Sequence, residues 1–268
     1  METFGYIASL AMGITLGLMG GGGSILTVPI MVYLFNISPT MATGYSLFVV
    51  GVTALIGSAM YIRKGDIDVK VGLVFAIPSV IGVTLSRGLI IPKLPEVILD
   101  VNGLTLTKEI LIMATFAALM IAASYSMIKK KKERKPISPH PLKRVALIAL
   151  EGLVIGLIAG FVGAGGGFLI IPALVLLAGL TMRVAIGTSL MIIALQSLLG
   201  FVGDLSRGIT VDWSLLVTVA TIAAVGIVVG SAVAHKIKEA KLKTAFGWFV
   251  LIMGTVILIE QLRHISFQ

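Results

Sequence analysis

Long apolar runs, separated by short polar segments, recur along the whole chain. They lie near residues 42–62, 70–91 and 109–128, and again near residues 185–203, 213–235 and 243–262. Each run reaches the roughly 20 residues that a helix needs to cross the hydrocarbon of a bilayer. The sequence lacks the short segments of alternating hydropathy that build membrane β-barrels. The pattern therefore predicts an all-α polytopic membrane protein.

Two further apolar segments, residues 4–35 and 145–178, are interrupted by glycine. Runs of glycine weaken a helix and expose backbone groups that lipid cannot hydrogen-bond, so we expect a helix break that is buried in protein or lies beside a polar cavity. A helix that restarts after the break would direct its N–H groups and positive dipole end into that cavity. The breaks thus predict an anion site, with tight helix packing as the alternative. Their residues are Gly20, Gly21, Gly22, Gly23 and Ser24 in the first segment, and Gly163, Gly165, Gly166 and Gly167 in the second.

The chain contains an internal repeat. Residues 17–65 align without a gap with residues 160–208, and after a one-residue slip the match continues from Asp68/Asp212 to Gly82/Gly226. Identical pairs include Gly20/Gly163, Pro29/Pro172, Gly44/Gly187, Ser46/Ser189 and Gly65/Gly208. We therefore expect a first membrane repeat over residues 1–128 and a second over residues 145–268. The basic, proline-broken stretch 129–144 between them is expected to be a cytoplasmic linker.

The relative orientation of the halves depends on the glycine-broken segments. If each segment crosses the bilayer once, the chain has eight spans, the halves are parallel, and the basic loop 235–243 lies outside. If each segment is a re-entrant hairpin, each half makes three crossings and the halves are inverted. The 12 residues from Ser24 to Phe35 favour the hairpin because they cover only ~18 Å as helix. The hairpin model also places more Lys and Arg in the cytoplasm, so we favour inverted repeats.

Polar side chains recur on the helix after each break. Ser38 and Thr181 have the residue types of helix N-caps, and Pro39 takes the favoured first helical position. One face then carries Ser46 and Thr53 in the first half, and Thr188, Ser189 and Gln196 in the second. We predict that these groups line the anion site. The alternative is that the hydroxyls bond to carbonyls of their own helix.

Composition agrees with a membrane class and narrows the chemistry. Hydrophobic residues make up 57% of the 268 positions and charged residues 12%, and mean hydropathy is +1.09. Without cysteine the chain forms no disulfide and has no thiolate chemistry. The net charge of +9 comes from loops, so no nucleic-acid partner is expected.

Ionisable residues are rare within the apolar runs. Glu151 and Arg87 are expected to extend toward an interface, with service as an anion ligand as the alternative for Arg87, and Asp204 and Arg207 are expected to lie in a loop. The sequence has no His–carboxylate cluster for a metal or a serine nucleophile, and no lysine follows the glycines as in a nucleotide-binding loop. We therefore expect no catalytic residue, metal or cofactor.

The glycine-rich motif ending in proline, followed by Ala-x-Gly-x-Ser-Leu, resembles the sulfite exporter TauE/SafE family, also described as sulfonate-permease-like. The second copy, with Ala185 to Leu190, matches closely, whereas the first has Tyr45 where the pattern favours threonine. The resemblance covers nearly the whole chain and implies transport of sulfur oxyanions or small organosulfonates across the cytoplasmic membrane.

Together these observations predict a secondary carrier or facilitator that binds a small anion near mid-membrane. Two alternatives stay open, an accessory subunit of a larger complex and an intramembrane enzyme, although no base is available to activate a nucleophile. The predicted substrate-binding residues are Gly20, Gly21, Gly22, Gly23, Ser24, Ser46, Thr53, Gly163, Gly165, Gly166, Gly167, Thr188, Ser189 and Gln196.

Overall fold

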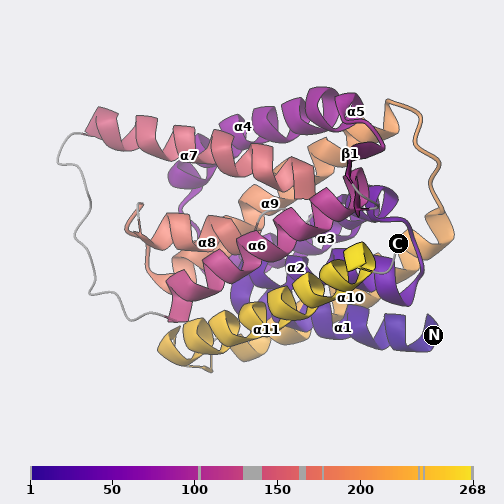
Figure 1. The fold of residues 1–268 in the computed structure, drawn as a ribbon. Coiled ribbons are helices and arrows are strands. Elements are labelled where there is room, and N and C mark those ends of the chain that lie inside the picture. The colour runs from indigo at the N-terminus through magenta and orange to yellow at the C-terminus, as the bar shows by residue number, and fades with distance from the viewer. Residues whose placement is uncertain are drawn as a thin grey trace.

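Each apolar run forms a helix at the predicted place along the chain (Figure 1). The computed structural model describes residues 2–101, 104–128, 141–162, 167–176, 178–234, 236–237 and 239–266. In chain order the elements are α1 (Glu2–Met19), the 3₁₀ turn η1 (Gly20–Gly23), α2 (Ser24–Pro29), the π-helical η2 (Ile30–Leu34), α3 (Pro39–Arg63), α4 (Val69–Leu85), the π-helical η3 (Ser86–Ile90), α5 (Ile91–Lys93), β1 (Val97–Val101), β2 (Leu104–Thr107), α6 (Lys108–Ile128), α7 (Pro141–Val162), α8 (Gly167–Leu176), α9 (Met182–Leu205), α10 (Trp213–Ala234) and α11 (Glu239–Ser266).

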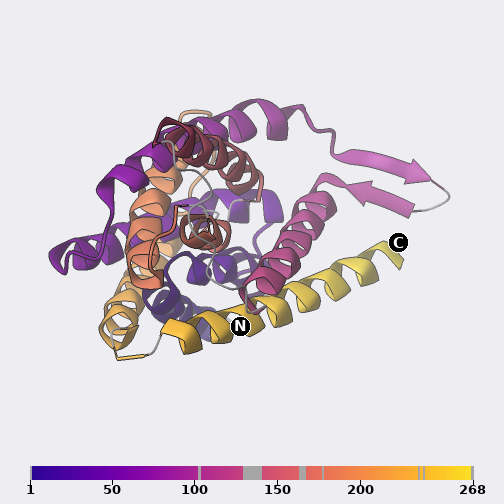
Figure 2. The same cartoon turned by 90° about the vertical axis from the view of Figure 1, so that its left-hand side faces the viewer.

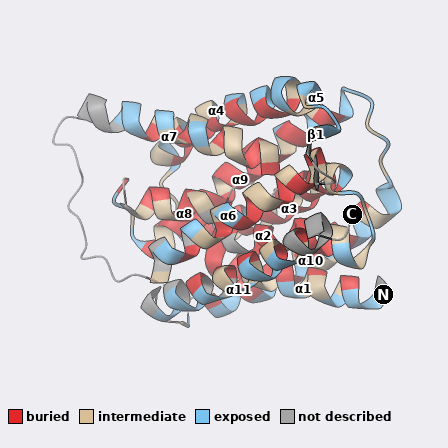
Figure 3. Cartoon of the chain, viewed as in Figure 1, coloured by how far each residue is buried: buried red, intermediate tan, exposed pale blue. Residues whose placement is uncertain are grey.

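Five segments within the described residues are long and apolar enough to cross a bilayer: Pro39–Arg63, Val69–Lys93, Val145–Val162, Met182–Leu205 and Trp213–Ala234. Large apolar side chains stand on their outer faces, among them Ile77, Val154 and Val225. A surface of this kind suits lipid rather than water. Figure 3 shows that buried positions concentrate in α3 and α9, which are the most enclosed of the five.

The two most enclosed helices pack against each other in opposite directions. Near the start of α3, Gly44 adjoins Asp204, close to the end of α9. Near the end of α3, Gly57 adjoins Leu190, in the first half of α9. This antiparallel pair forms the centre of the bundle, with α4 and α7 on one side and α1 and α10 on the other (Figure 1).

The first helix of each half packs on a helix of the other half. Helix α1 runs parallel to α10, and its repeat equivalent α7 runs parallel to α4. Glycine allows both approaches: a Cβ at Gly13 would lie 2.1 Å from the Ala223 oxygen, and a Cβ at the equivalent Gly156 would lie 2.1 Å from the Ser79 oxygen. Gly226 likewise has a packing role against Leu10. The halves are therefore joined by exchanged helix contacts.

Equivalent residues also adopt the same turns. Asn36 and Gly179 end the two glycine-broken segments with φ of 58° and 68°, and Gly65 and Gly208 follow α3 and α9 with φ of 73° and 83°. These left-handed conformations are strained for residues with a Cβ, so glycine or asparagine is favoured there. The repeat seen in the sequence thus extends to backbone conformation.

Some details differ from expectation. A short antiparallel hairpin, β1 with β2, projects from the bundle between α5 and α6 (Figure 2). Ser38 and Thr181 do occupy the N-cap positions of α3 and α9, but their side chains make no capping hydrogen bond. Residues 129–140 of the predicted linker lie outside the described residues, and α7 begins at Pro141.

Candidate functional site

The first glycine break turns the chain back on itself. Helix α1 ends at Met19, Gly20 takes a φ of 61°, and α2 begins at Ser24 after one 3₁₀ turn. The returning segment brings the Phe35 ring to 5.4 Å from the Tyr6 ring, centroid to centroid. The two ends of the segment therefore lie side by side, and the segment is a hairpin.

The second break meets the first in the interior. Gly163, Gly165 and Gly166 lie outside the described residues, whereas Gly167 begins α8. A Cβ on Gly21 would lie 2.1 Å from the Gly167 Cα, and a Cβ on Gly167 would lie 2.2 Å from the Gly21 Cα. The two segments, far apart in sequence, are thus in backbone contact at a point where only glycine fits.

We call the contact between the two glycine breaks the crossing. Among the predicted residues, Ser189 has a hydroxyl beside it. Its Oγ would lie 2.7 Å from a Cβ at Gly20, and the side chain is fully buried. The same hydroxyl donates a 2.8 Å hydrogen bond to the Ile186 carbonyl of its own helix. In this conformation the Ser189 oxygen offers lone pairs, and donating to an anion requires the hydroxyl to rotate.

The other predicted hydroxyls near the breaks follow the same pattern. Ser24 donates to the Gly21 oxygen at 2.6 Å, Ser46 to the Thr43 oxygen at 2.8 Å, and Thr53 to the Val49 oxygen at 2.6 Å. Bonding to the local backbone, the alternative considered for these residues, is therefore what the structure shows. Ser24, Ser46 and Thr53 are all buried.

Thr188 and Gln196 contact α4 and the loop before it. The Thr188 hydroxyl accepts a 2.9 Å hydrogen bond from the Asp68 N–H, and the Gln196 Oε1 accepts one from the Ser79 hydroxyl. The repeat equivalent of Thr188 is Tyr45, whose hydroxyl accepts a 2.8 Å bond from the N–H of Asp212. Tyr45, the departure from the family pattern, thus makes the equivalent contact with the opposite half.

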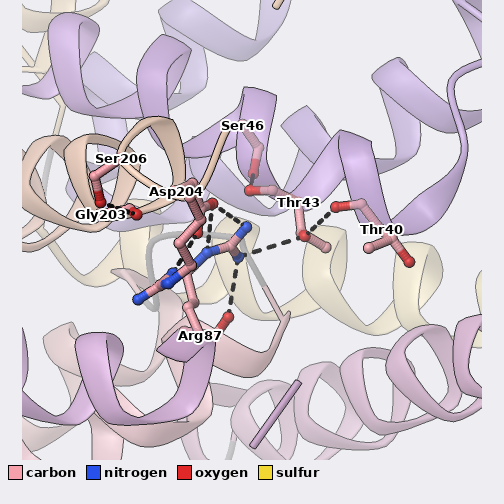
Figure 4. A network of polar contacts seen from close by, with 9 residues as sticks. Thr40, Thr43, Ser46, Arg87, Gly203, Asp204 and Ser206 are labelled. Carbon is pink, nitrogen blue, oxygen red and sulfur yellow. Dashed lines mark hydrogen bonds and ion pairs between the residues drawn. The ribbon is translucent and has the colours of Figure 1, made fainter. Parts of the chain in front are cut away.

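A buried ion-pair network lies beside the second break (Figure 4). The Arg87 Nε donates to Asp204 Oδ2 at 2.6 Å, a second guanidinium nitrogen pairs with the same oxygen, and Arg207 reaches Asp204 Oδ1 at 3.1 Å. The Arg87 Nη1 also donates to the Gly160 carbonyl at 3.1 Å, three residues before Gly163. This guanidinium therefore links η3, α9 and the end of α7.

The network corrects two sequence expectations. Arg87 does not extend to an interface, because it is only 8% exposed, and Asp204 lies in the last turn of α9 rather than in a loop, at 5% exposure. The usable signal was their opposite charge within apolar runs, where an ionisable residue needs a partner.

A pocket of about 240 Å³ opens next to the network, at the end of the bundle that carries β1. Its charged residues are Arg87, Lys108, Asp204 and Arg207. The remaining wall is formed by Thr40, Met41, Gly44, Tyr45, Ile91, Pro92, Ile209 and Thr210. We call this feature the cationic pocket. In the described part of the chain, no three His, Cys, Asp or Glu residues gather to hold a metal ion.

Comparison with known proteins agrees with this architecture. Residues 6–257 match the family model described as sulfite exporter TauE/SafE. The chain is 27% identical over 278 residues to the probable membrane transporter protein YunE of Bacillus subtilis, covering 95% of this chain and 96% of that protein. It is 25% identical over 252 residues to a probable membrane transporter protein of Xylella fastidiosa, covering 92% of this chain and 91% of that one. Given this match and the membrane-length helices, the chain is a multi-pass membrane protein that belongs to the TauE/SafE sulfite exporter family.

Proposed function

We propose that the protein is a secondary carrier or facilitator for small anions in the cytoplasmic membrane, with sulfur oxyanions or organosulfonates such as sulfite as substrates. The observation that carries this proposal is the crossing of the two glycine breaks, where Gly21 meets Gly167 and Ser189 adjoins Gly20. The family description, which names a sulfite exporter, supports the substrate class.

The chemistry of the crossing favours an anion without demanding a fixed positive charge. Each restarted helix contributes roughly half a positive charge at its N-terminus, together with backbone N–H donors. The hydroxyls of Ser24, Ser46 and Ser189 add neutral polar groups. A compact anion with several acceptor oxygens can take donors from both halves at once, whereas a cation is disfavoured.

The contact between Gly21 and Gly167 is too close to hold an anion between those two residues. The proposal therefore assigns the structure to a closed state, in which the hairpins must separate to admit substrate. The antiparallel packing of α3 and α9, which are repeat equivalents, supports an inverted arrangement of the halves. Inverted halves supply two equivalent states that open to opposite sides of the membrane.

Uptake of labelled sulfite by liposomes that contain the purified protein alone tests this function. We expect saturable uptake, competition by a short sulfonate, and weaker competition by chloride or a neutral amine. Gly21→Ala should abolish uptake because its Cβ meets Gly167, while Gly203→Ala, whose Cβ would meet only an Arg207 nitrogen at 3.8 Å, is the matched control. Absence of uptake by the wild type would favour an accessory subunit that needs other proteins.

Single-cysteine labelling tests the inverted arrangement, and the cysteine-free chain suits it. Cysteines placed at Lys64, Lys131 and Lys241 should all react only from the cytoplasmic side. Reaction at position 241 from outside would contradict inverted halves and favour eight parallel spans.

A further inference from the structure

The cationic pocket carries more positive than negative charge. Among the lining residues, Asp204 is the single carboxylate and pairs with both Arg87 and Arg207, and Lys108 is the third cation. We propose that this pocket is a second binding site for the transported anion, at one end of the protein only. The proposal rests on the proposed anion transport and adds where the substrate is first captured.

Lys108 is the first observation that points to an anion ligand. The residue is 8% exposed, and its ammonium lies 3.8 Å from a carboxylate oxygen of Glu96, whose side chain is 85% exposed. Within the residues that the structure describes, the ammonium makes no hydrogen bond. An ammonium that is largely withdrawn from water is costly unless it is paired and hydrogen-bonded. An anion in the pocket would supply both.

The size and the wall of the pocket suit a small hydrated anion. A volume of about 240 Å³ equals that of roughly eight waters, enough for a sulfite or sulfonate group with part of its hydration shell. The half-exposed Arg207 stands at the solvent side, whereas the buried Arg87 lies at the back. The cations thus extend inward from solvent, as expected of an electrostatic funnel.

The back of the pocket adjoins the second glycine hairpin. Arg87 bonds the Gly160 carbonyl, and the neighbouring Ser86 has its Cβ 3.0 Å from where a Gly160 Cβ would stand. On α9, Ser197 lies one turn from Ile193, which contacts Gly167. The Ser86 and Ser197 hydroxyls are buried, and no described group is their hydrogen-bond partner. Unused donors therefore lie between the pocket and the crossing.

The opposite end lacks the ion pair but not positive charge. At the repeat positions of Arg87 and Asp204 the chain has Ser231 and Tyr61, whereas Lys64 and Arg183 stand at those of Arg207 and Thr40. Because Arg87 has no charged counterpart, the proposal predicts capture that is stronger from the pocket end than from the other end.

Side-specific kinetics test the proposal. In liposomes of known protein orientation, Lys108→Gln and Arg207→Gln should each raise the KM for sulfite added at the pocket end by roughly three-fold or more. The maximal rate from the pocket end should stay within about two-fold of wild type. Lys64→Gln, at the repeat position of Arg207, is the control and should leave the pocket-end KM unchanged. Unchanged KM for both pocket variants in an active protein would overturn the vestibular site but not the transport function.

A second measurement is independent of transport and of the stability of the Lys108 variant. A cysteine at the exposed pocket residue Thr210 should react faster with an anionic than with a cationic thiosulfonate, and Arg207→Gln should reduce that ratio by about three-fold. Sulfate or ethanesulfonate should slow the reaction in phosphatidylcholine liposomes. Slowing by phosphatidylglycerol but by neither soluble anion would overturn the proposal in favour of a lipid headgroup site. Equal reaction rates for the anionic and cationic reagents would also overturn it, because they would show no positive potential in the pocket.

Discussion

In each glycine-broken segment the first helix ends with a backbone carbonyl that accepts a hydrogen bond from a side chain. The donor side chain differs between the two segments. In the first half, the Tyr61 hydroxyl donates a 3.1 Å hydrogen bond to the Gly17 carbonyl. In the second half, the equivalent Gly160 carbonyl accepts from Arg87, which is held by Asp204, the repeat equivalent of Tyr61. Both carbonyls precede a break in the helix, where intrahelical partners run out.

The comparison teaches that the fold requires a donor at this point but not a charge. A neutral phenol closes one hairpin, while an ion pair closes the other and borders the cationic pocket. The charge is therefore an addition made by one half, and the fold common to both halves does not explain it. Substitutions can therefore separate the donor that both halves need from the charge that only one half has.

The largest expected effect comes from breaking the ion pair. Arg87→Ser or Asp204→Tyr alone should destabilise the protein by about 3–5 kcal/mol, because each leaves a buried charge without its partner. The double variant Arg87→Ser/Asp204→Tyr reproduces the residues found beside the first break, Ser231 and Tyr61, and should recover about half of that loss or more. Denaturant unfolding in detergent measures all three, and strictly additive effects would contradict the equivalence of the two closures.

A second prediction asks whether the halves share the anion equally. Ser189→Ala should weaken sulfite binding by about 1.5–3 kcal/mol, since a hydrogen bond to a charged group is lost. Ser46→Ala should have a similar effect if the repeat is symmetric around the substrate. Ser124→Ala is the matched control, because Ser124 is also buried and also donates to its own helix, at Ile121. Calorimetric titration would contradict the central site if Ser189→Ala and Ser124→Ala bound sulfite equally well.

Loss of the hydrogen bond from Tyr61 should cost less stability than loss of the ion pair. Tyr61→Phe removes the donor to Gly17 without burying a charge, so we expect a loss of about 1–2 kcal/mol in the free energy of unfolding. Thermal unfolding of Tyr61→Phe beside Arg87→Ser provides the comparison. A loss as large as that of Arg87→Ser would mean that the charge adds nothing to the cost.

The smallest effects are expected at the exchanged loop contacts. Thr188→Val removes the acceptor for the N–H of Asp68, and Tyr45→Phe removes the acceptor for the N–H of Asp212 together with a long 3.3 Å donation to the Thr210 carbonyl. Both loops are partly open to water, which can replace the lost bond, so each variant should lose about 0.5–1 kcal/mol. Similar losses from a threonine and a tyrosine would confirm that the two side chains have the same role, and clearly unequal losses would contradict it.

The helices and the repeat were predictable because lipid imposes them. A membrane helix needs a long apolar run, and a glycine run inside it must be a break, so hydropathy and glycine located the helices apart from the three-residue α5. The Val97–Thr107 hairpin also has a signal in the sequence, because Asn102-Gly103 between alternating residues favours a two-residue β-turn.

The side-chain partners were less predictable. Arg87 and Asp204 are far apart in sequence, and their repeat equivalents Ser231 and Tyr61 are not a charged pair, so the duplication gave no indication of the contact. The hydroxyls of Ser46 and Ser189 face a choice between backbone and substrate that a sequence pattern does not decide. The anion site itself stays a prediction, as does the role of Gly163, Gly165 and Gly166, which lie outside the described residues.

The exchanged packing of α1 on α10 and α7 on α4 has a consequence for biosynthesis. When α1 leaves the ribosome, the surface on which it finally packs is still roughly 200 residues from being translated, a delay of about 10–40 s at ordinary elongation rates. Its close-packing glycines, Gly13 and Gly17, must remain without their final neighbour for that time. Neither half can complete its native contacts before the other is made, so nascent chains of this protein pass through a long-lived, partly assembled stage in the membrane.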